Sequence, residues 1–458
     1  MAITFNRIVI TLSTLIVFVI SPGVLANDEY IIKNVQVLSF TQQKFLPPMD
    51  VAVANGKIVA IEDTIESKTA LVIDGSHKYL VPGFTEMHAH IPPQNVKAAD
   101  VEDLLFLYSA YGITTVRGML GHPSHLILRK QLQSNQAKGP RLITSGPSFH
   151  GNSITSAEQA KEVVKQQFEM GYDFIKIHPG LSAEAFNAMA TQANGYRLPF
   201  AGHVTASVGV IKSIEAGQAS IDHIDGVLEE LAKRSGAQPQ TDTGFFGSAL
   251  VNAIDEKQIA PLAQQIAASG VAIVPTETLM YGFLSWQSAD ASAQKNVAQL
   301  MPQDIVDGWK RSRQAMQNAD WYSPENVQKL LMIRRKFLNE FINNNGVMLL
   351  GSDAPQVFNV PGDSLHEEMQ LMKQVGLTPL QVLYSASLGP AKYFGKDNEF
   401  GQISKGFSAD FVLLEKDPLA DIGNTRAIAG VMTRGQWLER SVIDGRLQEI
   451  NNKNKANQ

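Results

Sequence analysis

The chain of 458 residues has no cysteine. This absence excludes disulfide bridges, thiolate metal ligands, cysteine nucleophiles and lipid attachment to a cysteine. A net charge of −5 argues against an electrostatic grip on nucleic acid. The sequence also lacks a Gly-x-Ser-x-Gly turn, which argues against serine hydrolases of that class. Apolar residues make up 44% of the chain, enough for a folded core, so its chemistry must rest on histidine, carboxylate, lysine, serine or tyrosine.

Long hydrophobic runs are scarce as well. The longest lies at 8–20, after Arg7, and is shorter than the roughly 20 residues that span a bilayer. Ser21-Pro22-Gly23 breaks the run, and Val24-Leu25-Ala26 fits a cleavage site with small residues. We therefore predict a signal peptide at 1–26, a periplasmic or secreted protein, and no stable membrane span after cleavage. An uncleaved anchor or a buried first strand is the alternative.

Two short β-rich zones flank the rest of the chain. Residues 27–80 contain the hairpin signal Asn55-Gly56 between apolar runs, and 401–450 contain similar strand-like runs. We predict that the two zones form one small β-sandwich-like domain, followed by a polar tail at 451–458.

Between these zones, residues 81–400 alternate strand-like and helical runs. The strand candidates are Phe84–His90, Ile113–Arg117, Arg141–Ser145, Phe174–His178, Phe200–Val204, Ser220–Ile224, Val271–Thr276 and Val347–Asp353. This alternation predicts an α/β fold, a (β/α)8 TIM barrel, with a doubly wound open sheet as the competitor. The long connection 278–345 is expected to add helices over one face.

Polar side chains lie within or at the ends of these buried strands: His88, His90, Lys176, His203, His223 and Asp353. A buried charge must be paired, neutralised or bound to a metal. In a barrel, functional side chains gather at the carboxyl ends of the strands, so we expect these six to converge. Imidazole and carboxylate ligands without thiolates suit zinc, manganese or iron in a catalytic site. The alternative is a set of unrelated polar residues in the core.

The motifs Val81-Pro-Gly-Phe-Thr-Glu-Met-His-Ala-His90, Gly112-Ile-Thr-Thr-Val-Arg117 and Gly139-Pro-Arg-Leu-Ile-Thr-Ser-Gly146 are similar to those of the amidohydrolase superfamily. The chain resembles its imidazolonepropionase-like and Xaa-Pro-dipeptidase-like branch over nearly all of the mature sequence. In one departure, Gly118 follows Arg117 where relatives often have aspartate.

The resemblance implies a role for each residue. His88, His90 and Asp353 would bind one metal ion, and His203 and His223 a second. Lys176 would carry a carbamate that bridges two divalent ions, expected to be Zn²⁺. In a mononuclear site, Lys176 would instead pair with Asp353 or with the substrate.

The predicted function is hydrolysis of a carbon–nitrogen bond in a short peptide or another small molecule, of the dipeptidase or carboxypeptidase type. A metal-activated hydroxide would attack the carbonyl, with Asp353 as general base and then acid. An esterase, lactonase or phosphotriesterase with the same metal site is the alternative, as is a catalytically inactive binding barrel. We predict no nucleic-acid partner, and a homo-oligomer is compatible with the sequence.

Four further residues are predicted to bind substrate: Arg117, His150, His178 and Tyr281. Arg117 ends the second strand and offers a bidentate fork for a carboxylate, with a structural ion pair as the alternative. His178 lies two positions after Lys176 and therefore faces the same side of its strand. The alternative for His178 is a histidine at the rim of the barrel that hydrogen-bonds to backbone. The alternative for Tyr281 is a tyrosine that covers the core.

Overall fold

The computed structural model describes residues 29–93, 98–238 and 243–456, so the predicted signal peptide lies outside the described residues. Parallel strands follow one another through the middle of the chain. They are β7 (Phe84–Ala89), β8 (Ile113–Gly118), β9 (Arg141–Thr144), β10 (Ile175–Ile177), β11 (Phe200–Gly202), β12 (Ser220–Asp222), β13 (Ala272–Val274) and β14 (Val347–Met348). Their side chains are almost all buried, as expected for parallel strands covered on both faces.

These strands pair in sequential order, as β7-β8-β9 and as β10-β11-β12-β13-β14. A parallel bridge between Ser145 and Phe174 joins the end of β9 to the start of β10. At the other side, Met87 N donates to Leu350 O at 2.9 Å, which links β7 to the segment after β14. The result is a curled, barrel-like sheet, which agrees with the predicted α/β class. A doubly wound sheet would reverse its strand order at a switch point, and this one does not.

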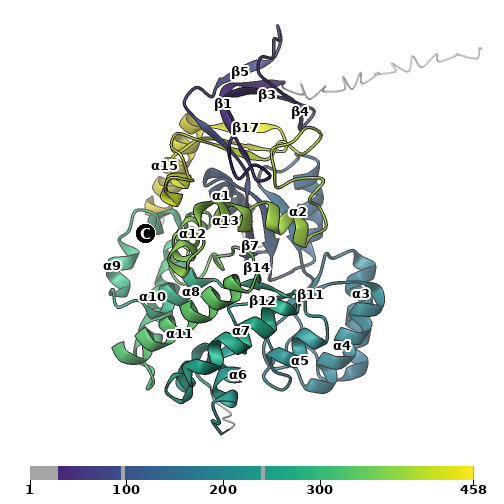
Figure 1. The fold of residues 1–458 in the computed structure, drawn as a ribbon, viewed down its shortest axis with the longest axis vertical. Coiled ribbons are helices and arrows are strands. Elements are labelled where there is room, and N and C mark those ends of the chain that lie inside the picture. Colours follow the sequence, from purple (N-terminus) through teal and green to yellow (C-terminus); the bar gives the residue numbers. More distant parts are fainter. Residues whose placement is uncertain (1–28, 94–97, 239–242, 457–458) are drawn as a thin grey trace, which may run out of the picture.

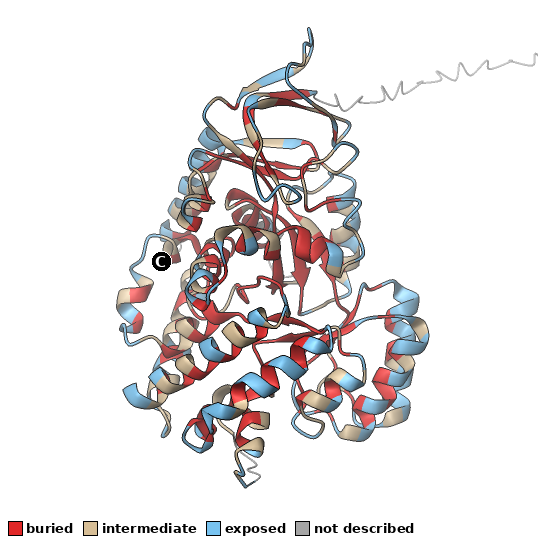
Figure 2. Cartoon of the chain, in the orientation of Figure 1, coloured by how far each residue is buried: buried red, intermediate tan, exposed pale blue. Residues whose placement is uncertain are grey.

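Helices cover the curled sheet (Figure 1). They are α1 (Ala98–Ala110), α2 (Ser124–Gln133), α3 (Ala157–Met170), α4 (Ala183–Tyr196), α5 (Val210–Glu215), α6 (Val227–Arg234), α7 (Ile259–Ala268), α8 (Glu277–Leu284), α9 (Ala289–Ala293), α10 (Gln303–Gln317), α11 (Pro324–Asn343), α12 (Asp363–Val375), α13 (Pro379–Ser385) and α14 (Leu388–Tyr393). Four of them, α8 to α11, arise from 278–345, as expected. Figure 2 shows buried inner faces and exposed outer faces. Within the described ranges, no helix is both long and apolar enough to cross a membrane.

Both ends of the described chain contribute to a second sheet. Its order is β17-β16-β15-β6-β1-β3-β4, and β2 and β5 also pair with β1. Figure 1 shows the purple N-terminal strands beside the yellow C-terminal ones. The strands are β1 (Tyr30–Ser39), β2 (Lys44–Phe45), β3 (Met49–Ala54), β4 (Lys57–Glu62), β5 (Leu71–Asp74), β6 (Tyr79–Pro82), β15 (Phe411–Leu414), β16 (Ile428–Thr433) and β17 (Gln436–Glu439). The antiparallel pair β6–β15 joins the two ends.

The prediction of a polar tail at 451–458 is wrong for its described part. Helix α15 (Arg440–Ala456) continues through these residues. Ile443 and Ile450 bury one face of the helix, and Lys453 pairs with Asp103 of α1 at 2.8 Å. These contacts with distant parts of the chain hold in place a segment whose own composition is polar.

Candidate metal and active site

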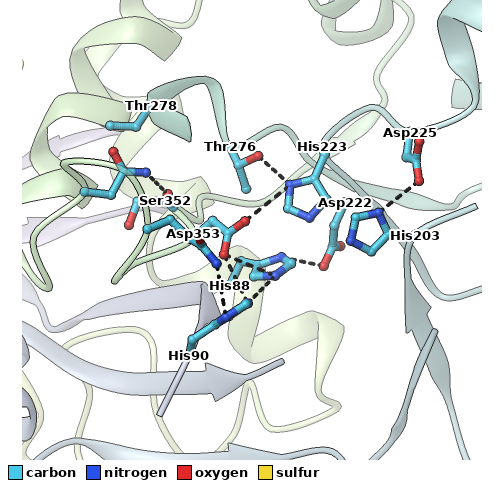
Figure 3. Close-up of polar contacts among 12 residues, drawn as sticks. His88, His90, His203, Asp222, His223, Asp225, Thr276, Thr278, Ser352 and Asp353 are labelled. Atoms are coloured by element: carbon cyan, nitrogen blue, oxygen red, sulfur yellow. Dashed lines mark hydrogen bonds and ion pairs between the residues drawn. The ribbon is translucent and has the colours of Figure 1, made fainter. Parts of the chain in front are cut away.

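Six predicted ligands lie at the carboxyl ends of the strands, and Figure 3 shows the four histidines and Asp353 together. They are His88 on β7, His90 directly after it, Lys176 on β10, His203 after β11, His223 after β12 and Asp353 after β14. The tightest group is His88, His90 and Asp353, whose ligand atoms all lie within 4.8 Å of one another. Asp353 Oδ1 lies 3.1 Å from His90 Nε2 and 3.7 Å from His88 Nε2. Nitrogen and oxygen atoms of this kind, gathered from separate strands, fit a divalent cation.

The second nitrogen of three imidazoles is held by an oxygen. His88 Nδ1 lies 2.8 Å from Asp222 Oδ2, and His203 Nδ1 lies 3.0 Å from Asp225 Oδ2. Thr276 Oγ1 lies 2.8 Å from His223 Nδ1. The contact between His203 and Asp225 is a hydrogen bond, and because an ionised carboxylate only accepts hydrogen bonds, the His203 ring carries its proton on Nδ1 and keeps the lone pair of Nε2. Support of this kind is typical of histidines that bind metal ions.

Burial keeps these imidazoles neutral. It lowers the pKa of His88 and of His223 well below the ordinary value, and that of His90 to about 3. The positive charge of Lys176 adds to this effect at all three rings. Neutral imidazole is the form that coordinates a metal, so the electrostatics of the site agree with its geometry.

Lys176 is fully buried, and its Nζ has no hydrogen-bond partner among the described residues. Gly202, with φ of +119°, leaves room for it, because a β-carbon there would lie 2.8 Å from Lys176 Cδ. Burial lowers the pKa of Lys176 to about 8, even though Asp222 and Asp353 act in the opposite direction. A buried amine without a partner costs free energy, whereas a carbamate between two cations would be satisfied. The residues present therefore fit a site for a divalent metal ion.

Three residues of the site have left-handed backbone conformations that residues other than glycine rarely adopt. The φ angles are +64° at His223, +50° at Thr276 and +61° at Asp353. Such conformations persist only where the surroundings enforce them, and they cluster at functional sites.

The prediction that Arg117 binds a substrate carboxylate is not supported. Its side chain is completely buried, and Nη2 lies 3.1 Å from both carboxylate oxygens of Asp222. Its Nε donates to Met87 O at 2.6 Å, and Nη1 donates to Ser220 Oγ at 2.9 Å. All three guanidinium nitrogens are thus engaged. Arg117 holds Asp222, which in turn lies against His88.

Tyr281 contacts a residue of a neighbouring helix. It lies on α8, and its hydroxyl accepts a hydrogen bond from exposed Arg335 of α11 at 3.2 Å. This contact joins α8 to α11, and the substrate contact of Tyr281 stays a prediction.

His178 and His150 lie nearer to the converging residues. The ring of His178 stacks on that of His203, with centroids 5.2 Å apart. Burial, with the charge of Lys176, lowers the pKa of His178 to about 2, and His150 is close enough to contribute. His150 Nδ1 accepts a hydrogen bond from Asn152 N at 3.2 Å. A substrate contact for either residue stays a prediction.

Several supporting residues were missed in the sequence: Asp222, Asp225, Thr276, Glu86 and Ser352. The Glu86 carboxylate accepts hydrogen bonds from His88 N at 3.0 Å and from Ser352 Oγ at 2.6 Å, and so ties β7 to the segment before Asp353. Burial raises the pKa of Glu86 to about 8. Glu86 and Asp222 are acidic residues inside apolar strands, which is the signal that identified Lys176 and could also have identified them.

Comparison with known proteins agrees with this fold. The sequence model of the amidohydrolase family matches residues 79–438, and the chain belongs to this family of hydrolases. A bottromycin amidohydrolase has a similar structure, with a TM-score of 0.72 and 20% identity over 92% of this chain and 90% of the other. A putative prolidase from Bifidobacterium longum gives a TM-score of 0.66 and 21% identity, over 92% and 99% of the two chains.

Among curated sequences, a dihydroorotase of Elusimicrobium minutum (strain Pei191) is 38% identical over 63 residues. This match covers 14% of this chain and 14% of the dihydroorotase. A match of this length carries no conclusion about the activity of the whole protein.

Proposed function

We propose that the protein is an exported, zinc-dependent amidohydrolase that cleaves an amide or peptide bond in a short peptide or an N-acylated amino acid. The observation that carries this proposal is the convergence of four imidazoles, Lys176 and Asp353, with oxygen partners behind three of the rings. The structural likeness to a bottromycin amidohydrolase and to a putative prolidase supports the choice of a carbon–nitrogen bond. We further infer that the strands form one closed (β/α)8 barrel with a small β-sandwich-like domain, which the hydrogen bonds at both seams support.

In this proposal, His88, His90 and Asp353 would hold one divalent ion and His203 and His223 another, with Lys176 as a bridging carbamate. The ions would lower the pKa of a water molecule and polarise the scissile carbonyl. Asp353 takes up the proton of that water and returns it to the leaving nitrogen, because an amine leaves readily only when it is protonated. Asp222, Asp225 and Thr276 keep the imidazoles oriented throughout.

A library of dipeptides and N-acyl amino acids, including Xaa-Pro members, tests this proposal. The protein as purified is loaded with Zn²⁺, and the release of free amino acid is measured. The same preparation, treated with a chelator and then with fresh Zn²⁺, serves as control. We expect release that stops on chelation and returns with zinc. Hydrolysis of esters, lactones or phosphotriesters, with no release from any amide, would contradict the proposal.

A further inference from the structure

One phenylalanine lies beside two imidazoles of the site, and two more phenylalanines continue from it. The ring centroid of Phe246 is 5.2 Å from that of His223 and 6.0 Å from that of His203, to which it is nearly parallel at 10°. Phe245 lies 4.8 Å from Phe246, and Phe283 of α8 lies 4.9 Å from Phe245. We refer to Phe245, Phe246 and Phe283 together as the aromatic wall.

The aromatic wall packs against the hydrophobic core but is only partly buried. Phenylalanines that only fill the interior, such as Phe337 and Phe341, are fully buried, whereas each residue of the wall is half-buried. An apolar surface that stays partly open beside convergent polar groups is the usual composition of a site for a small ligand.

The backbone fixes the ring that is nearest to the imidazoles. Phe246 has φ of +49° and ψ of +48°, a conformation that favours glycine. The segment is held by Thr243, whose Oγ1 donates to Glu229 Oε1 of α6 at 3.0 Å and whose carbonyl accepts from Ala249 N at 3.0 Å. An aromatic side chain in a strained conformation next to a reactive site points to a functional constraint on its position.

Two arginines near the imidazoles, Arg117 and Arg334, form hydrogen bonds with other residues of the protein. Arg117 is paired with Asp222, and Arg334 donates to Glu277 Oε1 at 2.8 Å and to His223 O at 2.8 Å. Both arginines are completely buried. The surface that a ligand would meet next to His203 and His223 is therefore the aromatic wall rather than a free guanidinium.

We propose that the aromatic wall binds an aromatic or branched aliphatic group that adjoins the scissile bond, and so sets substrate preference. This substrate class rests on the proposed amide hydrolysis. Aromatic rings gain from contact with other rings beyond the area that they bury, so a phenyl group should be preferred over a methyl group at this position.

Two hydroxamates test the wall without any turnover. Acetohydroxamate and phenylacetohydroxamate share the metal-binding group and differ by a phenyl ring, and their affinities for the zinc-loaded protein are measured by calorimetry. We expect wild type to bind phenylacetohydroxamate at least about tenfold more tightly than acetohydroxamate. Phe246→Gly, which suits the left-handed backbone, and Phe283→Ala, on a different element, should each lower this ratio severalfold. The control Phe168→Ala removes an exposed ring of α3 that stacks on Tyr196, and should leave the ratio unchanged.

Equal affinity of the two hydroxamates for wild type would overturn the inference, as would a preference that survives both substitutions in the wall. Together with the dipeptide and N-acyl amino acid assay described above, this measurement separates the inference from the proposed function. If wild type prefers phenylacetohydroxamate and loses the preference with Phe246→Gly, yet cleaves no amide, the aromatic wall is supported and the proposed reaction is wrong.

Discussion

Asp353→Asn is expected to lower kcat/KM for amide hydrolysis by about 10³-fold or more, because asparagine can neither take up a proton nor return it. Asp353 Oδ1 lies 3.1 Å from His90 Nε2, so the substitution also removes a negative charge from the group that would hold an ion. Excess Zn²⁺ can offset the weaker metal binding but cannot replace the lost proton carrier, so it should not restore the activity. The measurement is the rate on the best substrate over a range of zinc concentrations.

Asp225→Asn is the matched control. Asp225 lies 3.0 Å from His203 Nδ1 and supports that ring from behind. Loss of such support typically weakens metal affinity by roughly 10–100-fold, so this variant should regain activity at high zinc concentration. If excess zinc restored Asp353→Asn equally well, Asp353 would act only as a ligand and not as the proton carrier.

Arg117→Met is expected to destabilise the protein by about 3–5 kcal/mol, because it leaves the buried carboxylate of Asp222 without its cation. Although burial alone raises the pKa of Asp222, Arg117 and Lys176 outweigh that effect and hold the pKa below the usual value. Without Arg117, the charge of Asp222 is poorly compensated. Adding Asp222→Asn to Arg117→Met should recover part of the loss. Urea unfolding of both single variants and of the double variant measures this coupling.

The partly exposed pair of Arg129 and Asp173 provides the comparison. Arg129 Nη1 lies 2.7 Å from Asp173 Oδ2, and the two side chains are 16% and 36% exposed. Surface pairs contribute about 0–1 kcal/mol, so Arg129→Met should cost far less than Arg117→Met. Equal costs for the two variants would show that the buried pair does not hold this part of the fold.

Much of the site could be predicted from residue types in their local context. A lysine inside Phe174-Ile-Lys-Ile-His178 and an aspartate after Met348-Leu-Leu are anomalies that need a function in a buried strand. Strand-like runs alternate with helical runs along the sequence, which predicted a barrel in which the carboxyl ends of the strands lie close together. The structure brings these residues to one place because consecutive strands are neighbours in space.

The supporting residues escaped prediction for a physical reason. Strand alternation places neighbours such as Asp222 and His223 on opposite faces, yet the left-handed backbone at His223 (φ +64°) turns both toward the site. The partner of Arg117 is likewise set by the tertiary fold, because Asp222 lies on a different strand. The polar end of α15 is stabilised by ion pairs with α1, which local composition does not reveal.

Titration of the chelator-treated protein with Zn²⁺, with bound metal and amide hydrolysis followed together, tests whether the protein is a binuclear amidohydrolase. We expect hydrolysis to rise with bound metal and to level off at about two ions per chain, as a binuclear site built from His88, His90, Lys176, His203, His223 and Asp353 requires. Amide hydrolysis at full rate without bound metal, or two bound ions without hydrolysis of any amide, would contradict it.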